Sequence, residues 1–148
     1  MAYTKLLYHI VFSTKQRQPT IVLEYERELY AYIMGIIAQA EGHLYRIGGM
    51  PDHIHIIADI PSKISLSDFV KRLKQGSSNW LAANPHFPHW NRWEESYGAF
   101  TYAYNDLQEV VDYVRNQKEH HKKVSFTEEY RKLLDDFGIE YDERYIPK

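Results

Sequence analysis

The spacing of hydrophobic and polar residues along the chain predicts four strands and four helices. Stretches rich in β-branched and aromatic residues, which favour strands, cover residues 4–15, 43–60 and 97–104, the second of them with a central turn. Apolar residues recur at helical spacing over residues 23–41, 65–84, 105–123 and 126–138. The order βαββαβ followed by helices predicts an α+β fold of the ferredoxin-like (split βαβ) kind. We expect a four-stranded antiparallel sheet, helices on one face and a C-terminal helix that carries candidate catalytic residues.

Local signals support these element boundaries. Gly48, Gly49 and Pro51 lie in the predicted turn between the second and third strands. Ser65 is the predicted N-cap of the second helix, with Asp68 three positions later. No internal repeat, low-complexity tract or linker interrupts the pattern, so we expect residues 1–148 to form one domain.

The composition narrows the class of protein. The chain has 148 residues, of which 44% are hydrophobic, and this suits a single core. It contains no cysteine, which excludes disulfides and thiolate metal sites and favours a cytoplasmic protein. No apolar run is long enough to cross a bilayer, and the first residues do not have the pattern of a signal peptide, so we expect no membrane association.

Charge is distributed unevenly. The net charge of −2 argues against a protein that coats nucleic acid non-specifically. Basic residues nevertheless gather in residues 1–20 and 61–80, whereas the segment 124–148 is acidic. The candidate phosphate contacts are Lys5, Lys15, Arg17, Lys63, Lys71, Arg72 and Lys74. The large aromatic residues that can stack on unpaired bases, or pack in a core instead, are Trp90, Trp93 and Tyr97.

The stretch "GGMPDHIHIIADI", residues 48–60, places two histidines in an apolar strand. Alternate side chains of a strand point to the same face, so His53 and His55 stand side by side while their neighbours point into the core. Two neutral imidazoles on the face opposite the helices, which we expect to be free, can bind one divalent cation. The alternative is a pair of polar residues on an open sheet face. Asp52 can orient a histidine or serve only the turn.

A metal site needs a further ligand, and the helix predicted over residues 105–123 offers candidates. Tyr113 and Gln117 are four positions apart and share one face of that helix. Gln117 can offer a neutral oxygen to a hard cation such as Mg²⁺ or Mn²⁺, and Tyr113 would then lie beside the metal. His120 and His121 are rival third ligands. The alternative places Tyr113 in an apolar stripe and exposes the other three side chains to solvent.

Several motifs along the chain together resemble one family. They are "YHIVFSTKQR", "MPDHIHIIADIP", "SLSDFVKRLK", "WEESYGAFTYAY" and "VVDYVRNQKEHHKKVSF". In this order they resemble the single-tyrosine HUH transposases of the insertion-sequence-200/605 group, including the REP-associated tyrosine transposases. The resemblance runs over most of the chain. The "KEHH" segment and the acidic tail depart from the family pattern, which leaves the dimer geometry and the third metal ligand open.

The resemblance implies a role for each candidate residue. His53 and His55 match the metal-binding pair, Gln117 the third ligand of Mg²⁺ or Mn²⁺, and Tyr113 the nucleophile. The implied activity is that of a DNA transposase, which cleaves and rejoins single-stranded DNA at hairpin-bearing element ends through a 5′-phosphotyrosine intermediate. Members are commonly homodimers, and in some the tyrosine helix of one subunit completes the site of the other.

Three other functions compete with this interpretation. One is a domesticated relative that cleaves a repeated hairpin in its host genome. Another is a non-enzymatic domain that binds single-stranded nucleic acid on a ferredoxin-like sheet. Such domains carry an aromatic-rich strand, which "YGAFTYAY" resembles only loosely. The third is a metal-dependent hydrolase that forms no covalent intermediate and for which Tyr113 is dispensable.

Overall fold

The strands form one antiparallel sheet. A computed structural model describes residues 2–148, and its strands are β1 (Leu7–Ser13), β2 (His43–Met50), β3 (His53–Asp59) and β4 (Gly98–Thr101). They lie side by side in the order β2-β3-β1-β4, and every neighbouring pair is antiparallel. This order confirms the ferredoxin-like fold, because the two central strands are the first strand of each βαβ half.

The helices follow the predicted order, with one difference. They are α1 (Glu26–Gln39), α2 (Leu66–Ala83), α3 (Leu107–Arg115), α4 (Gln117–His120) and α5 (Phe126–Asp136), with short 3-10 turns at Lys15–Arg17, Leu23–Tyr25, Tyr104–Asp106 and Glu143–Tyr145. Ser65 caps α2 as predicted, since its Oγ accepts a hydrogen bond from the Asp68 amide at 3.1 Å. The single helix predicted over residues 105–123 is instead broken at Asn116 into α3 and α4.

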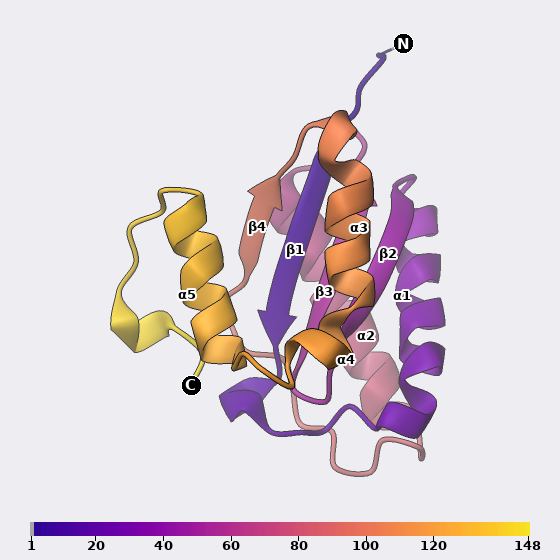
Figure 1. Ribbon diagram of the computed structural model, residues 1–148. Coiled ribbons are helices and arrows are strands. Elements are labelled where there is room, and N and C mark those ends of the chain that lie inside the picture. Colours follow the sequence, from indigo (N-terminus) through magenta and orange to yellow (C-terminus); the bar gives the residue numbers. More distant parts are fainter. Residues whose placement is uncertain (1) are drawn as a thin grey trace.

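Helices cover both faces of the sheet. The core between the sheet and the helices α1 and α2 contains Ile10, Phe12, Ile54 and Ile56. On the opposite face, α3 packs over Ile57 and α5 packs over neighbouring apolar side chains of β1 and β4. In Figure 1, α3 lies in front of the sheet, α2 lies behind it, and α5 stands to the left of β4. The prediction that the second face is free is therefore wrong, because the segment after residue 106 folds back over it.

The glycines predicted to form a turn belong to β2 instead. Gly48 and Gly49 lie in that strand just before its last residue, Met50, and only Pro51 and Asp52 form the turn to β3. Gly48 pairs with His55 in the sheet. A Cβ atom at Gly48 would clash with the backbone carbonyl of Val114, so the missing side chain allows α3 to lie directly on β2.

Among residues 2–148, no helix combines the length and hydrophobicity that spanning a membrane requires.

Candidate active site

The histidine pair lies on the face of β3 that α3, α4 and α5 cover. His53 and His55 point away from the Ile54 and Ile56 side chains, as the alternation of the strand predicts, and neither imidazole is exposed to solvent. His53 Nδ1 donates a hydrogen bond to Asp52 Oδ1 at 2.8 Å. Of the two roles considered for Asp52, the structure therefore supports the orientation of a histidine.

Two of the candidates from residues 105–123, Gln117 and Tyr113, lie beside this pair. Gln117 is fully buried at the start of α4, and its Oε1 lies 3.3 Å from His53 Nε2. Tyr113, one turn earlier on α3, has its ring centroid 5.9 Å from that of His55 in an edge-to-face arrangement. The four residues predicted from the sequence thus lie together within one chain, and all of them except Tyr113 are fully buried.

A fifth residue at the centre of the cluster was not predicted. Glu129 of α5 is buried, and each of its carboxylate oxygens accepts hydrogen bonds from the cluster. Oε1 lies 3.0 Å from the Nε2 atoms of both His55 and His121, while Oε2 accepts hydrogen bonds from Tyr113 and Gln117. The sequence does contain a signal, because this acid interrupts the apolar stripe of the last predicted helix.

The two rival third ligands differ in position. His121 is almost fully buried, and its ring centroid lies 4.6 Å from that of His53. His120 is half-buried, with its Nε2 3.2 Å from Glu129 Oε2 but without hydrogen-bond geometry to any described residue. His121 is therefore the one that hydrogen-bonds to Glu129 and packs against His53, whereas His120 lies beside Tyr113.

A further histidine and a tyrosine support the ring of His55. His9 of β1 is fully buried, and its Nε2 lies 2.7 Å from His55 Nδ1. The Tyr102 hydroxyl lies 3.5 Å from the other ring nitrogen of His9. Burial lowers the pKa of His9 well below its ordinary value. His9 is therefore a neutral partner that fixes the orientation of the His55 ring.

The hydrogen-bond pattern around His53 leaves one polar conflict. Because His53 Nδ1 donates to Asp52, its Nε2 carries a lone pair. This lone pair faces Gln117 Oε1 at 3.3 Å and Glu129 Oε1 at 3.6 Å, both of which are acceptors. Turning the Gln117 amide over would only move the conflict to Glu129 Oε2, to which its Nε2 now donates at 3.0 Å.

A cation resolves this conflict, so the cluster fits a divalent metal. Burial lowers the pKa of His53 to about 4, although the hydrogen bond to Asp52 acts in the opposite direction, so the ring is neutral at ordinary pH. Buried electron-pair donors that face one another without a hydrogen between them are costly. Imidazole nitrogen and amide or carboxylate oxygen are common ligands of divalent metals.

The charges on Tyr113 and Glu129 are set by the same contacts. Burial raises the pKa of Tyr113 above its ordinary value, and the adjacent Glu129 carboxylate raises it further. Burial alone would raise the pKa of Glu129, but hydrogen bonds from His121 and His55 outweigh it and hold that pKa far below its usual range. The resting state is therefore a neutral phenol bound to an ionised carboxylate.

A cleft of about 680 Å³ between α3 and α5 leads to the hydroxyl of Tyr113. Besides Tyr113 and Glu129, the acidic residues Asp106, Glu109 and Asp136 line it, and one base, Lys132, pairs with Asp136 there, so acids outnumber bases. This negative lining would repel a phosphate group, and a bound divalent cation would reduce that repulsion.

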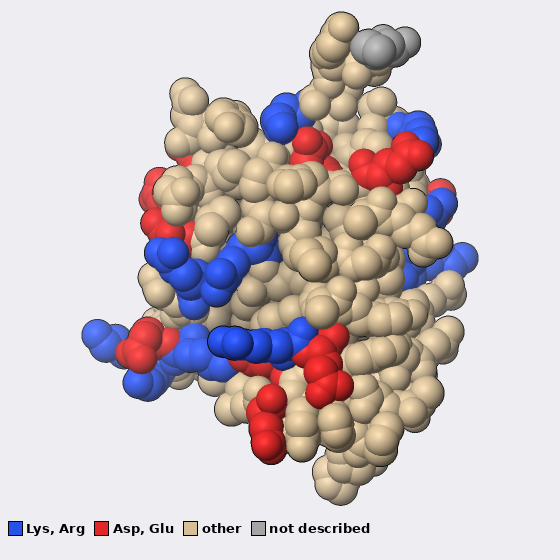
Figure 2. Space-filling view, turned by 90° about the vertical axis from the view of Figure 1, so that its right-hand side faces the viewer, with Lys and Arg blue, Asp and Glu red and all other residues tan. Residues whose placement is uncertain are grey.

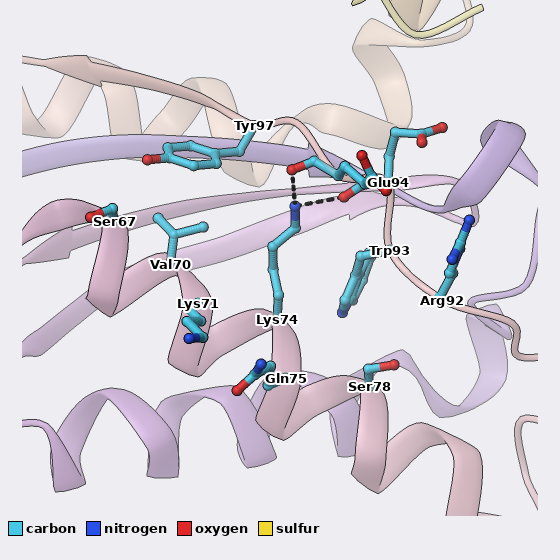
Figure 3. Close-up of a pocket in the computed structure, with 11 residues that line it drawn as sticks. Ser67, Val70, Lys71, Lys74, Gln75, Ser78, Arg92, Trp93, Glu94 and Tyr97 are labelled. Carbon is cyan, nitrogen blue, oxygen red and sulfur yellow. Dashed lines mark hydrogen bonds between the residues drawn. The ribbon is translucent and has the colours of Figure 1, made fainter.

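The predicted phosphate contacts are distributed over several surfaces. Arg17 forms an ion pair with Asp52 at 3.1 Å, and Lys5 forms one with Asp59 at 3.5 Å. Figure 3 shows the Lys74 ammonium directed at the 94–96 loop, where it donates to the carbonyls of Glu94, Glu95 and Ser96. Lys63 is exposed and pairs with Glu41. Lys71 and Arg72 are exposed, and Lys15 is half-buried.

Two of the three aromatic candidates are tied into the fold. Trp93 is buried in the core beneath α2, and its Nε1 donates to Ser77 Oγ at 2.9 Å. Trp90 donates to Ser78 at 3.2 Å and packs edge-on against Trp93. Tyr97 lines the surface pocket beside Lys71 and Lys74 (Figure 3). Of the two roles considered for the tryptophans, packing is the one that the structure supports.

The face on the α1 side carries both signs of charge. Figure 2 shows Lys and Arg side chains gathered in groups on this face, each with acidic side chains close by.

Comparison with known proteins identifies the family of the chain. The family model described as "Transposase IS200 like" matches residues 2–117, a span that contains His53, His55, Tyr113 and Gln117. The chain belongs to this family. Membership confirms the resemblance given by the sequence motifs, and the chain is a transposase of the IS200/IS605 group.

Relatives and solved structures agree with the family. The chain is 29% identical to the ISDra2 transposase TnpA of Deinococcus radiodurans, over 76% of this chain and 84% of the relative. It is 30% identical to the transposase for insertion sequence element IS200 of Salmonella typhimurium, over 78% of each chain.

Two solved structures share the fold. A crystal structure of a protein from Deinococcus radiodurans has a TM-score of 0.62 and 31% identity, over 78% of this chain and 93% of the other. A REP-associated tyrosine transposase, solved bound to a REP hairpin, has a TM-score of 0.63 over 84% of this chain and 73% of the other. Its identity is 16%, so this second likeness is one of fold alone.

Proposed function

We propose that the protein cleaves and rejoins single-stranded DNA through a covalent 5′-phosphotyrosine formed on Tyr113. One observation carries this proposal. Tyr113, both histidines of the pair and Gln117 meet in one cluster, although they come from a strand and two helices. A cleft lined by Tyr113 and Glu129 reaches this cluster. Family membership supports it, because transposases break and rejoin DNA.

The residues proposed to hold the cation are His53, His55 and Gln117. A divalent metal, Mg²⁺ or Mn²⁺, would polarise the scissile phosphate and neutralise charge that develops on it. Asp52 holds the ring of His53 and His9 holds the ring of His55, so both imidazoles are oriented before a ligand arrives.

Tyr113 is proposed as the nucleophile. Its oxygen attacks phosphorus, a bond from phosphorus to the tyrosine oxygen forms, and the bond to the 3′ oxygen of the DNA breaks. The phenol must lose its proton in this step because its pKa is raised, and Glu129 Oε2 already accepts its hydrogen bond. The leaving 3′ oxygen takes up a proton, and a 3′-OH can reverse the reaction and rejoin DNA without ATP.

The proposed substrate is a single-stranded DNA end that carries a hairpin. The family resemblance supports this choice, as does the fold shared with a REP-associated transposase that was solved with a REP hairpin. Lys15, Lys71 and Arg72 are the first proposed phosphate contacts, because they are not fully buried. Lys63 is a further candidate, whose present partner is the exposed carboxylate of Glu41. Lys5, Arg17 and Lys74 stay candidates only if DNA displaces their present partners.

The experiment that tests this function is a covalent-adduct assay. Labelled single-stranded DNA from both flanks of the gene is incubated with the protein and Mg²⁺ or Mn²⁺ and run on a denaturing gel. We expect a metal-dependent shifted band that Tyr113→Phe abolishes and that Tyr145→Phe, a change at an exposed tyrosine, preserves. Cleavage that persists in Tyr113→Phe would indicate a hydrolase without a covalent step, and metal-independent binding without cleavage would indicate a binding domain.

On the family resemblance we also propose a homodimer, in which each site is complete within one subunit. The contacts of Tyr113 and Gln117 with the histidine cluster of their own chain support this arrangement. Molar mass in solution tests the dimer. Mixing Tyr113→Phe with His55→Ala tests the arrangement, because complementary mutants restore the adduct only if one subunit's tyrosine serves the other's metal site.

A further inference from the structure

The segment that follows the family similarity contributes two side chains to the cluster. The match to the family ends at residue 117, whereas His121 and Glu129 lie beyond it. Ser125 caps α5 by accepting a hydrogen bond from the Glu128 amide at 3.2 Å, and this fixes the start of the helix. Glu129, one turn into α5, therefore points at the sheet beside the buried Phe126, not at solvent.

The potential ligand atoms of these two residues converge with those of the histidine pair. One ligand atom from each of His53, His55, His121 and Glu129 can be chosen so that all of them lie within 4.8 Å of one another. Three imidazoles and a carboxylate at this separation form a common donor set for a divalent transition metal. The residues are almost fully buried, so water cannot complete the hydrogen bonding of each group separately.

The two oxygens of Glu129 have different partners. Oε1 lies among the imidazole Nε2 atoms, at 3.0 Å from His55 and 3.6 Å from His53. Oε2 accepts the hydrogen bond from the Tyr113 hydroxyl. One carboxylate thus lies between the position a cation would take and the oxygen that would attack phosphorus.

We propose that Glu129 and His121 are ligands of the same divalent cation as His53 and His55, and that Glu129 links this cation to Tyr113. The site then has ligands from β3, α4, the residue that follows α4, and α5. The proposal rests on the proposed function for the use of the site, but metal binding can be measured without DNA.

A competing explanation needs no metal. In this explanation the Glu129 carboxylate, held by its hydrogen bonds with His55 and His121, blocks the site by occupying the cation's place. The two explanations predict opposite effects of removing the charge of Glu129. Loss of a ligand weakens metal binding, whereas loss of a blocking carboxylate strengthens it.

The test is a Mn²⁺ titration of the full-length, metal-stripped protein, followed by the electron paramagnetic resonance signal of free Mn²⁺. We expect Glu129→Gln and His121→Asn each to weaken binding at least about tenfold, since even partners that only orient a ligand change affinity by about 10–100-fold. Asp135→Asn is the matched control, because it removes a carboxylate from an exposed position of the same helix. We expect it to bind Mn²⁺ as the wild type does.

Equal or tighter Mn²⁺ binding by Glu129→Gln would overturn the proposal and establish the blocking role. Circular dichroism checks that each variant is folded. If Glu129→Gln does not fold, Glu129→Asp replaces it. Its carboxylate is one methylene shorter, so we expect a smaller Mn²⁺-induced rise in melting temperature than for the wild type, and an equal rise contradicts the proposal.

Two further variants separate this proposal from the proposed function. Tyr113→Phe should keep Mn²⁺ affinity while losing the DNA adduct, and His53→Ala should lose both. If the wild type binds Mn²⁺ through Glu129 but forms no adduct on any DNA, the metal site stands and the transposition chemistry fails. If His53→Ala binds Mn²⁺ like the wild type, the cation site itself fails.

Discussion

The two faces of β3 are equally buried but are buried in different ways. Ile54 and Ile56 belong to the apolar core under α1 and α2. His53 and His55, one position away in each case, contact other polar groups under α3, α4 and α5. All four side chains are inaccessible to solvent. Burial alone therefore does not distinguish a residue that stabilises the fold from one that carries chemistry.

The two faces differ in the kind of side chains that must pack against them. An apolar face is satisfied by any close-packed side chains of suitable volume. A polar face must provide a partner for each donor and acceptor, and any group left without one marks a place for a ligand. The conflict at His53 Nε2 is such a place, whereas the α1 and α2 side has none among the buried residues described.

The largest expected effect is on activity and comes from the polar face. His55→Ala should reduce the rate of covalent-adduct formation by more than about 100-fold, because a lost ligand should cost more than the 10–100-fold typical of its supporting partners. The rate is measured from the shifted band on a denaturing gel. His43→Ala, a change at an exposed histidine of β2, is the control. A normal rate in His55→Ala would remove the histidine pair from the mechanism.

A change at the next residue should act on stability instead. Ile56→Ala creates a cavity in a fully buried position and should lower the free energy of unfolding by about 2–5 kcal/mol. Urea denaturation measures this loss. Ile139→Ala, at a largely exposed position, should change stability by less than about 0.5 kcal/mol. Equal losses in the two variants would contradict the assignment of the core to the α1 and α2 face.

The polar face should also make the metal-free protein sensitive to acid. The pKa of His53 is about 4 in the fold because burial lowers it, against an ordinary value of 6.5. Between these values the unfolded chain binds a proton that the folded chain does not, so stability falls as pH falls from 6.5 to 4. The loss should approach about 3 kcal/mol for this group, measured by urea denaturation with a chelator present. His53→Gln should reduce this slope, and an unchanged slope would show that His53 does not cause it.

The smallest expected effects compare two serine caps. Ser65 caps α2 on the apolar side and Ser125 caps α5 on the polar side, each by accepting an amide hydrogen bond. Replacement of either by alanine should lower the free energy of unfolding by about 1 kcal/mol. Only Ser125→Ala should also slow adduct formation, because α5 positions Glu129. Equal adduct rates in the two variants would indicate that the start of α5 does not influence the site.

Much of this organisation could be predicted from the sequence, because strand alternation and helix periodicity act locally. The alternation of residues 53–56 predicts which side chains share a face, and the spacing from Tyr113 to Gln117 predicts one turn between them. The fold class followed from the order of elements. The histidine pair became specific only with the other family motifs, since two histidines at alternate positions are a weak signal.

The features that were missed depend on contacts between distant segments. No local pattern indicates that α5 folds over β1 and delivers Glu129 to His55, because the two residues are far apart in sequence. The expected turn at Gly48 and Gly49 was wrong because glycine also serves a strand on which another backbone packs closely. The break at Asn116 was missed because the helical periodicity continues through it.

Gly48 determines how far apart the nucleophile and the metal-binding strand lie. A Cβ atom at this position would meet the carbonyl of Val114, next to Tyr113, and the partner of Gly48 in the sheet is His55. Each increase in side-chain volume at position 48 would move α3 outward by a further step while leaving every proposed ligand of β3 in place. A series of substitutions from alanine to valine would therefore work as a molecular ruler, which reports how strictly phosphoryl transfer depends on the reach of the tyrosine.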